Sequence, residues 1–187
     1  IVGFASQQAF SNIISGIFIV IFRPFRVNDI IKVGSFDSGI VEDITLRHTV
    51  IRSFENRRLV IPNTVISEQT VLNSTLVDEH VCMYIEIGIS YESDVDKAIA
   101  IMQNECARHP FCVDHRTIEQ ATANQHIVEA KVLNLGETAV MLRASVWAND
   151  AIKGFDMKCD LLLNLKKRFD SEGIEFPFHH RTTVFKK

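Results

Sequence analysis

The strongest constraint on this chain lies in its first segment, residues 1–25, which contains no charged side chain before Arg23. A helix of about 20 apolar residues is long enough to span a bilayer, and this segment has roughly that length. Polar residues interrupt it at positions 6–8 and again at Ser11 and Asn12. Because a helix that faces only lipid does not tolerate so many polar groups, we predict that a neighbouring helix or the water of a pore contacts them.

The second half of this segment, residues 11–22, is amphipathic at helical spacing. Isoleucine, valine and phenylalanine cover most of the helix, and the apolar run ends abruptly at Arg23-Pro24-Phe25-Arg26. Basic residues just beyond an apolar segment are typical of cytoplasmic flanks. A buried helix of a soluble protein is one interpretation, but the density of isoleucine and phenylalanine favours a helix at a membrane interface. The small or polar side is formed by Ser11, Asn12, Ser15 and Gly16.

Residues 27–77 are predicted to form a small all-β domain. Short β-prone runs alternate with turn residues such as Asp37-Ser38-Gly39. Pro62 ends one run, because proline has no N–H to donate to a strand ladder. Several short strands at this spacing favour an Sm-like barrel. The expected strands are residues 30–33, 39–46, 49–53, 58–61 and 71–72.

Residues 78–178 follow the order strand, helix, strand, strand, helix, strand, which predicts a ferredoxin-like α+β layer. Apolar side chains occupy every second position from Val81 to Ile89, as in a half-buried strand. Similar alternation predicts strands over 126–135 and 140–146, and residues 175–178 are expected to be extended. The domain organisation is therefore residues 1–26, 27–77, 78–178 and a short C-terminal strand within 179–187.

Two helices are expected in this α+β domain. Ser93-Asp94 caps the first, and Asn149 or Asp150 caps the second, which Gly173 ends. The core face predicted for the first helix is Val95, Ala98, Ile99, Met102 and Cys106. The core face predicted for the second is Ile152, Phe155, Cys159, Leu162, Leu165 and Phe169.

Composition excludes several classes of function. The formal net charge of −3 argues against a nucleic-acid binder. The four cysteines lack disulfide-rich spacing and are expected to be reduced thiols in the cytosol. No glycine-rich phosphate loop, nucleophile elbow or metalloprotease helix motif is present, so we expect neither an enzyme nor a cofactor. The chain begins inside an apolar stretch, without Met or a basic leader, which predicts a fragment of a longer protein.

One metal-like pattern combines Cys106, His109, Cys112 and His115 at three-residue spacing, and two Cys with two His are a zinc ligand set. Pro110 breaks the segment, no outer ligand pair exists at finger-like distance, and Cys106 already fits the helix core. We therefore expect no metal here.

Five short motifs resemble one known family. They span nearly the whole chain in the family's order, beginning with Ser11-Asn12, Gly16 and Phe22-Arg23-Pro24-Phe25, which resemble the end of a third transmembrane helix. The others are residues 60–63 (VIPN), 89–94 (ISYESD), 145–149 (SVWAN) and 173–177 (GIEFP). Together they are similar to the mechanosensitive channels of small conductance, the MscS family.

This resemblance implies a homoheptameric channel in the inner (cell) membrane of a bacterial-type cell, with residues 27–187 in the cytoplasm. Such channels open under membrane tension and release ions and small osmolytes after a hypo-osmotic shock. Residues 1–9 would end the pore-lining helix and residues 10–22 would form an interfacial helix. Residues 182–185 would supply one strand of an oligomeric barrel below a hollow vestibule, where His179-His180 either line the wall or form a plain exposed pair.

The resemblance also implies roles near the pore for Gly3, Phe4 and Gln8. Phe4 falls at an apolar constriction ring that would gate by dewetting, or it packs between helices. Gln8 stands where family members often have a glycine at a helix bend, which leaves Gly16 as the glycine able to bend the helix.

Three further residues are candidates for lipid or interdomain contact. Arg23 and Arg26 lie where anionic headgroups would be, and each such charge contributes about 1 kcal/mol. Alternatively they pair with Asp29 or Glu42. Asn12 either holds the interfacial helix to the β domain by hydrogen bonds or lies on the helix surface.

Two other functions remain open at this stage. The first is an oligomeric cytoplasmic regulatory or ligand-sensing scaffold attached to a membrane segment, which tension-dependent current would separate from a channel. The second, a soluble small-molecule-binding enzyme, is disfavoured by residues 1–25.

Overall fold

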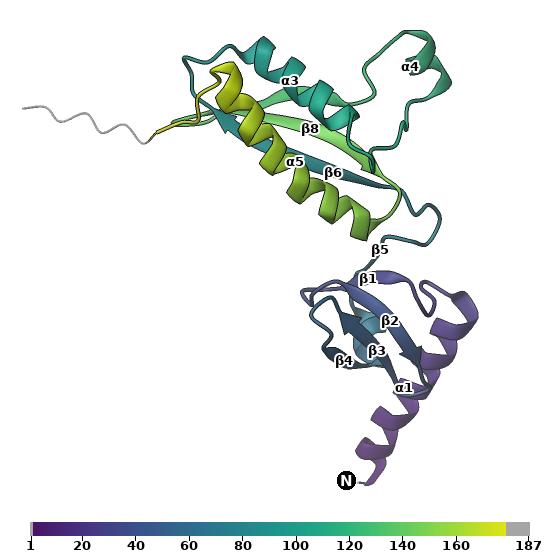
Figure 1. The fold of residues 1–187 in the computed structure, drawn as a ribbon. Helices are drawn as coiled ribbons and strands as arrows, with labels where there is room; N and C mark the ends of the chain where they lie inside the picture. Colours follow the sequence, from purple (N-terminus) through teal and green to yellow (C-terminus); the bar gives the residue numbers. More distant parts are fainter. Residues whose placement is uncertain (1, 179–187) are drawn as a thin grey trace, which may run out of the picture. The chain divides into compact units, whose positions relative to one another are not determined.

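The computed structural model describes residues 2–178, with side chains from Gln7 onward (Figure 1). The chain forms two compact units, an N-terminal unit of residues 1–79 and a C-terminal unit that begins at His80. The helix α1 belongs to the first unit together with the strands that follow it. The finer four-part division expected from the sequence stays a prediction.

Helix α1 (Val2–Phe22) runs without interruption. Its residue Ile19 is 4% exposed and reaches the core of the N-terminal unit, where Phe25, just after the helix, is 1% exposed. Within residues 2–178, no helix combines the length and the apolar content that a bilayer crossing requires.

The N-terminal unit is built on a five-stranded antiparallel sheet with the order β4-β3-β2-β1-β5. β4 and β5 stand at the two ends of this strand order. The all-β domain is confirmed, and the finer expectation of an Sm-like barrel stays a prediction. The sequence analysis missed helix α2 (Asn63–Glu68), which follows β4 directly. The strands are β1 (Ile30–Val33), β2 (Gly39–Ile44), β3 (His48–Ser53), β4 (Arg58–Pro62) and β5 (Val71–Asn73).

The C-terminal unit has a three-stranded antiparallel sheet, in which β8 (Val140–Ala148) lies between β6 (Val81–Ile89) and β7 (Glu129–Leu135). Helices α3 (Val95–Ala107) and α5 (Ala151–Glu172) cover one face, and their side chains form the core with β6 and β8 (Figure 1). A short helix, α4 (Ile118–Thr122), lies in the connection before β7.

These strands have the order and directions of the first three strands of a ferredoxin-like layer. The predicted fourth strand is absent from the described residues, because residues 174–178 form no ladder. A single backbone bond ties that segment to the end of β6, from the N–H of Ser90 to the carbonyl of Glu175 (2.8 Å).

The predicted helix ends are confirmed. Asp94 accepts a hydrogen bond from the Lys97 N–H, and Asp150 accepts one from the Lys153 N–H. Gly173 ends α5 with φ +73°, a left-handed conformation that glycine adopts without steric cost.

The predicted core face of α5 is wrong for most of its length. Phe155 is 62% exposed and Ile152 is 48% exposed. The physical reason lies at Gly154, where a Cβ atom would stand 3.0 Å from side-chain carbons of Met83 and Val81, so the helix turns its glycine to the sheet. The buried positions are Gly154, Met157, Leu161, Leu165 and Phe169.

Candidate functional site

Buried polar residues are concentrated where α1 meets the β sheet. Among the described residues, four polar residues are buried as a whole, and three of them, Asn12, Thr49 and Asn63, lie in this place. We call the set formed by Asn12, Gly16, Thr49, Asn63 and Thr64 the α1 junction. A buried polar group destabilises a fold unless it is hydrogen-bonded, so the bonds of these residues define how α1 is held.

Asn12 connects α1 to the start of α2. Its side chain is 6% exposed, and its Oδ1 accepts hydrogen bonds from the backbone N–H of Thr64 (3.1 Å) and from the Thr64 hydroxyl (3.0 Å). Its Nδ2 donates to the carbonyl of Gln8 on the same helix (3.0 Å). One amide therefore fixes the helix to a segment 52 residues away and satisfies an N–H at the first turn of α2.

Asn63 is the second anchor of the junction and is fully buried. Its Oδ1 accepts from the hydroxyl of Thr49 on β3 (2.9 Å), and its Nδ2 donates to the carbonyl of Thr45 in the β2–β3 turn (2.9 Å). Its backbone N–H donates to the carbonyl of Arg47 (3.1 Å). Asn63, the first residue of α2, is thus bonded to β3 and to the β2–β3 turn.

Gly16 allows α1 to approach these groups. A Cβ atom at this position would lie 2.5 Å from the carbonyl oxygen of Leu46 and 2.6 Å from Nδ2 of Asn63. Both distances are shorter than real carbon contacts, so only glycine fits without a shift. The structure therefore gives Gly16 a close-packing role. The bend expected at Gln8 or Gly16 stays a prediction.

The opposite side of α1 carries a continuous set of exposed apolar side chains. Phe22 is 75% exposed and Phe18 is 54% exposed, and their rings lie 5.8 Å apart. A patch of this kind marks a surface that meets another protein or a membrane. Its members are Phe10, Ile13, Ile14, Ile17, Phe18, Val20, Ile21 and Phe22.

Arg23 and Arg26 follow α1. Among the described residues, neither guanidinium group forms an ion pair. Neither acidic partner that the sequence suggested, Asp29 or Glu42, pairs with the guanidinium group of Arg23 or Arg26 among the described residues. Asp29 accepts from the backbone N–H of Arg26 (2.9 Å) and from the Asn73 amide (2.8 Å). Arg23 itself adopts φ +49° where the helix ends.

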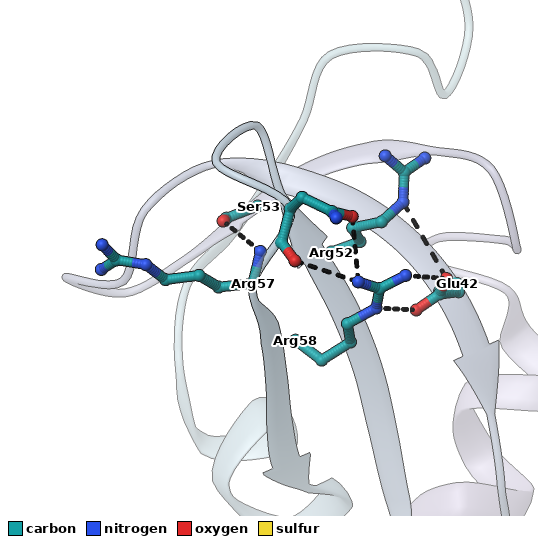
Figure 2. Close-up of polar contacts among 6 residues, drawn as sticks. Glu42, Arg52, Ser53, Arg57 and Arg58 are labelled. Atoms are coloured by element: carbon teal, nitrogen blue, oxygen red, sulfur yellow. Dashed lines mark hydrogen bonds and ion pairs between the residues drawn. The ribbon is translucent and has the colours of Figure 1, made fainter.

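Glu42 is held by two other arginines (Figure 2). Arg58 on β4 makes two bonds to the Glu42 carboxylate, from Nε (3.1 Å) and from Nη2 (3.3 Å), and Arg52 on β3 lies 3.9 Å away. The Nη1 of Arg58 also donates to the carbonyl and to the side chain of Asn56 in the hairpin loop. Glu42, Arg52 and Arg58 together link β2, β3 and β4 on a half-exposed surface, where such ion pairs contribute modestly to stability.

The predicted pore residues fall at the margin of the described region. Gly3 and Phe4 belong to α1, and the side chain of Phe4 lies outside the part of the chain whose side chains the structure describes. Gln8 is exposed, and its carbonyl accepts the bond from Asn12. The predicted barrel strand at 182–185 and His179-His180 also lie outside the described residues.

The four candidate zinc ligands do not converge. Burial raises the pKa of the Cys106 thiol to about 12, and burial also raises the pKa of Cys112. The Nδ1 of His109 accepts from the Phe111 N–H (3.2 Å), and the His115 ring stacks on Trp147 at 3.8 Å. Nowhere in the described chain do three potential ligands gather as a metal site would require.

Comparison with known proteins gives consistent matches along the chain. Residues 8–76 match the family model of the mechanosensitive ion channel β-domain, and residues 84–176 match that of the C-terminal region of the mechanosensitive ion channel MscS. An MscS family protein of Archaeoglobus fulgidus is 30% identical over 99% of this chain and 61% of its own length. The large-conductance mechanosensitive channel MscMJLR of Methanocaldococcus jannaschii is 30% identical over 100% of this chain and 50% of its own length.

A solved structure shows the same fold. The crystal structure of Helicobacter pylori MscS in a closed state superposes on this chain with a TM-score of 0.84 and 22% sequence identity. The match covers 100% of this chain and 69% of the Helicobacter pylori chain. The chain spans about half to three fifths of the length of the two curated relatives named above. From the two consecutive family models and the shared fold, this chain belongs to the MscS family of mechanosensitive ion channels, which are not enzymes, and it comprises the β-domain and the C-terminal domain.

Proposed function

We propose that this chain is part of a subunit of an ion channel that membrane tension opens, releasing ions and small osmolytes on hypo-osmotic shock. Family membership supports this function, and relatives carry the names of mechanosensitive channels. One observation carries the proposal for this chain itself. The polar side of α1 is fixed to the β-domain by buried hydrogen bonds, whereas its apolar side is exposed.

This two-sided helix is suited to transmit a mechanical load. A force applied through the apolar side of α1 reaches the β-domain through Asn12 and through the close contact at Gly16. Each net hydrogen bond contributes about 0.5–1.5 kcal/mol, and a buried partner left unpaired costs about 1–3 kcal/mol. The two bonds between Asn12 and Thr64 therefore contribute to keeping α1 docked on the β-domain.

The remaining features of the proposal come from the family resemblance. The subunits form a homoheptamer in the inner (cell) membrane, residues 27–187 face the cytoplasm, and residues 182–185 contribute to a shared barrel. A ring of Phe4 side chains closes the pore by dewetting, with Gly3 and Gln8 close to that ring.

We also propose that Arg23 and Arg26 contact anionic lipid headgroups at the membrane surface. The alternative of local ion pairs loses support because the Asp29 carboxylate accepts from the Arg26 backbone N–H and the Asn73 amide rather than from a guanidinium group. Glu42 is bound by Arg58. Each arginine then contributes about 1 kcal/mol of attraction to an anionic surface.

A hypo-osmotic shock assay tests the physiological function. The full-length protein is expressed in bacteria that lack their own mechanosensitive channels, and survival is counted after a sudden dilution of the medium. We expect the protein to restore survival. If a folded, membrane-inserted oligomer leaves lysis unchanged, the chain is better explained as an oligomeric regulatory or ligand-sensing scaffold attached to a membrane segment.

A further inference from the structure

A cleft of about 370 Å³ opens within the C-terminal unit, beside the connection that carries α4. Its lining comes from this connection, from the start of β7 and from Ser145 and Trp147 near the end of β8. These two residues alternate along β8 with Ala144 and Val146, which are fully buried in the core under α3 and α5. The cleft therefore lies on the face of the sheet that these two helices leave uncovered. None of the roles assigned above uses this space.

Part of the lining of this cleft is aromatic. The ring of His115 stacks on the indole of Trp147, with the ring centres 3.8 Å apart and the planes 8° from parallel. The segment that carries His115 is fixed to β8 by a bond from the N–H of Val113 to the carbonyl of Trp147 (2.8 Å). Aromatic side chains bind the flat faces of nucleobases by stacking. These rings favour a flat heterocycle as the ligand.

Arg116 supplies hydrogen-bond donors at a fixed position in the cleft. Its Nε and Nη2 donate to the two carboxylate oxygens of Asp114 (2.9 and 2.7 Å), and its Nη1 donates to the carbonyl of Gln125 (2.6 Å). The side-chain hydrogen bond from Arg116 lowers the pKa of Asp114 to about 2, so the pair stays ionised at neutral pH. A guanidinium group has five N–H donors, and these bonds use three. Two N–H groups of Arg116 thus have no acceptor among the described residues.

Glu129 supplies an acceptor in the same cleft. It is the first residue of β7 and the only acidic residue of the lining. Its carboxylate pairs with the exposed Lys131 (2.5 Å), but a carboxylate has two oxygens with about four lone-pair positions. The cleft therefore offers a ligand both the donors of Arg116 and the acceptor of Glu129.

We propose that this cleft binds a guanine base. Guanine carries two neighbouring acceptors, O6 and N7, which arginine binds through two hydrogen bonds. Its N1–H and its N2 amino group are donors that suit a carboxylate such as that of Glu129. Adenine has an amino group in place of O6 and lacks the N2 amino group, so the cleft prefers guanine. This site goes beyond the proposed channel function and does not rest on it.

Binding of two nucleotides tests the choice of base. The 187-residue chain is titrated with guanosine monophosphate (GMP) or adenosine monophosphate (AMP) in a calorimeter. Both carry the same ribose and phosphate, so a difference in affinity reports the base. We expect GMP to bind roughly 5- to 150-fold more tightly than AMP, the discrimination of one good bidentate contact. Fluorescence of Trp147, the only tryptophan of the chain, should change with GMP. Equal affinities, or no binding of GMP, would overturn the proposal.

Glu129→Gln tests the acceptor, because it keeps the size of the side chain and removes its negative charge. We expect this variant to lose most of the preference for GMP over AMP. Glu137→Gln is the matched control, since Glu137 is an exposed glutamate between β7 and β8 that does not line the cleft. A preference that survives in the Glu129 variant, or that falls equally in both variants, contradicts the site.

Arg116→Lys tests the donors, because lysine keeps the positive charge but lacks the planar pair of N–H groups. We expect GMP to bind roughly 5- to 150-fold more weakly to this variant, whereas the exposed Arg108→Lys leaves its affinity unchanged. Urea unfolding without nucleotide shows whether each variant keeps its fold. A folded Arg116 variant that binds GMP as tightly as the unmodified chain would overturn the assignment, and the Glu129 test stands independently of it.

Discussion

At the scale of single residues, Asn63 is a fully buried amide that is bonded to both Thr49 and Thr45. Asn63→Ala leaves the Thr49 hydroxyl buried without its partner. We expect the free energy of unfolding to fall by about 1–3 kcal/mol, measured by urea denaturation. Thr49→Val and the double variant complete a cycle, and the double variant should lose less than the sum of the two single losses. Strictly additive losses would show that the two side chains act independently.

Gly16 offers a prediction in which two physical effects oppose each other. Replacing a helical glycine by alanine ordinarily stabilises a helix by about 1 kcal/mol. Here the added Cβ would stand 2.5 Å from the Leu46 carbonyl oxygen, so we expect the contact to dominate and Gly16→Ala to undock α1. Faster hydrogen exchange in α1 would report this change, with Ser15→Ala as the control. Unchanged or slower exchange in the Gly16 variant would mean that α1 is not packed as the structure shows.

Phe4 carries the prediction for the pore. If a ring of Phe4 side chains excludes water from the closed channel, a hydroxyl in its place should admit water and ions. Phe4→Ser is therefore expected to raise the resting conductance and to slow the growth of cells that produce the full-length channel. Normal growth and an unchanged resting conductance would instead indicate that Phe4 packs between helices.

At the scale of elements, α3 and α5 are joined at their ends by charged groups. The Lys97 ammonium donates to the carbonyl of Glu172 (2.7 Å) and pairs with its carboxylate (3.1 Å), and Arg168 also contacts that carboxylate (2.9 Å). The hydrogen bond from Lys97 and the nearby positive charges lower the pKa of Glu172. A depressed pKa in the folded state stabilises the fold above the unfolded pKa, and this stabilisation is lost as the pH falls through the folded value.

This linkage predicts an acid-dependent difference between variants. Glu172→Gln should lower stability slightly at neutral pH, and its difference from the unmodified protein should shrink as the pH falls below the ordinary glutamate value of 4.5. Thermal unfolding over this pH range measures the effect, with the exposed Glu92→Gln as the control. A difference between Glu172→Gln and the unmodified protein that does not change with pH would contradict the assigned ion pairs.

The elements also show how far the sequence determines the fold. Period-two alternation predicted β6 and β8 well, since Ile85, Ile89, Leu142 and Val146 are all buried. The alternation predicted over 126–135 does not continue through β7, where Val132 is 42% exposed and the pairing register shifts between Val132 and Asn134. A bulge reverses the facing of the residues beyond it, and the sequence carries no glycine or proline there to reveal it.

The helices α2 and α5 were harder to predict for two different reasons. α2 has only six residues, too few to display a periodic pattern, and it begins directly after Pro62. α5 has apolar residues on two faces, so periodicity alone does not choose between them. The choice is made by the close approach of Gly154 to β6, a contact between distant parts of the sequence.

In the α1 junction, too, contacts between residues far apart in the sequence could not be predicted from the sequence alone. Asn12 stood out because it interrupts an apolar helix, but its partner Thr64 lies 52 residues away and carries no signal of its own. The role of Asn63 in the junction was hidden for the same reason, and a glycine at position 16 suggested a bend rather than a close contact. Sequence patterns locate polar residues within an element, whereas the bonds across the junction depend on how the elements pack.

At the scale of the whole molecule, the proposal joins a helix with one apolar side to a β-domain and a C-terminal domain of the MscS family. In this proposal, tension acts on the helix, and the α1 junction transmits its movement to the β-domain. This account requires that the complete protein conduct ions and that tension control the conductance.

The most direct test is patch-clamp recording of the full-length protein in a lipid bilayer while suction is increased in steps. The account predicts current that appears above a threshold tension and disappears when suction is released. It also predicts a changed threshold in Asn12→Ala, which removes the bonds to Thr64. A folded oligomer in the bilayer that stays silent at every tension up to membrane rupture would contradict the account.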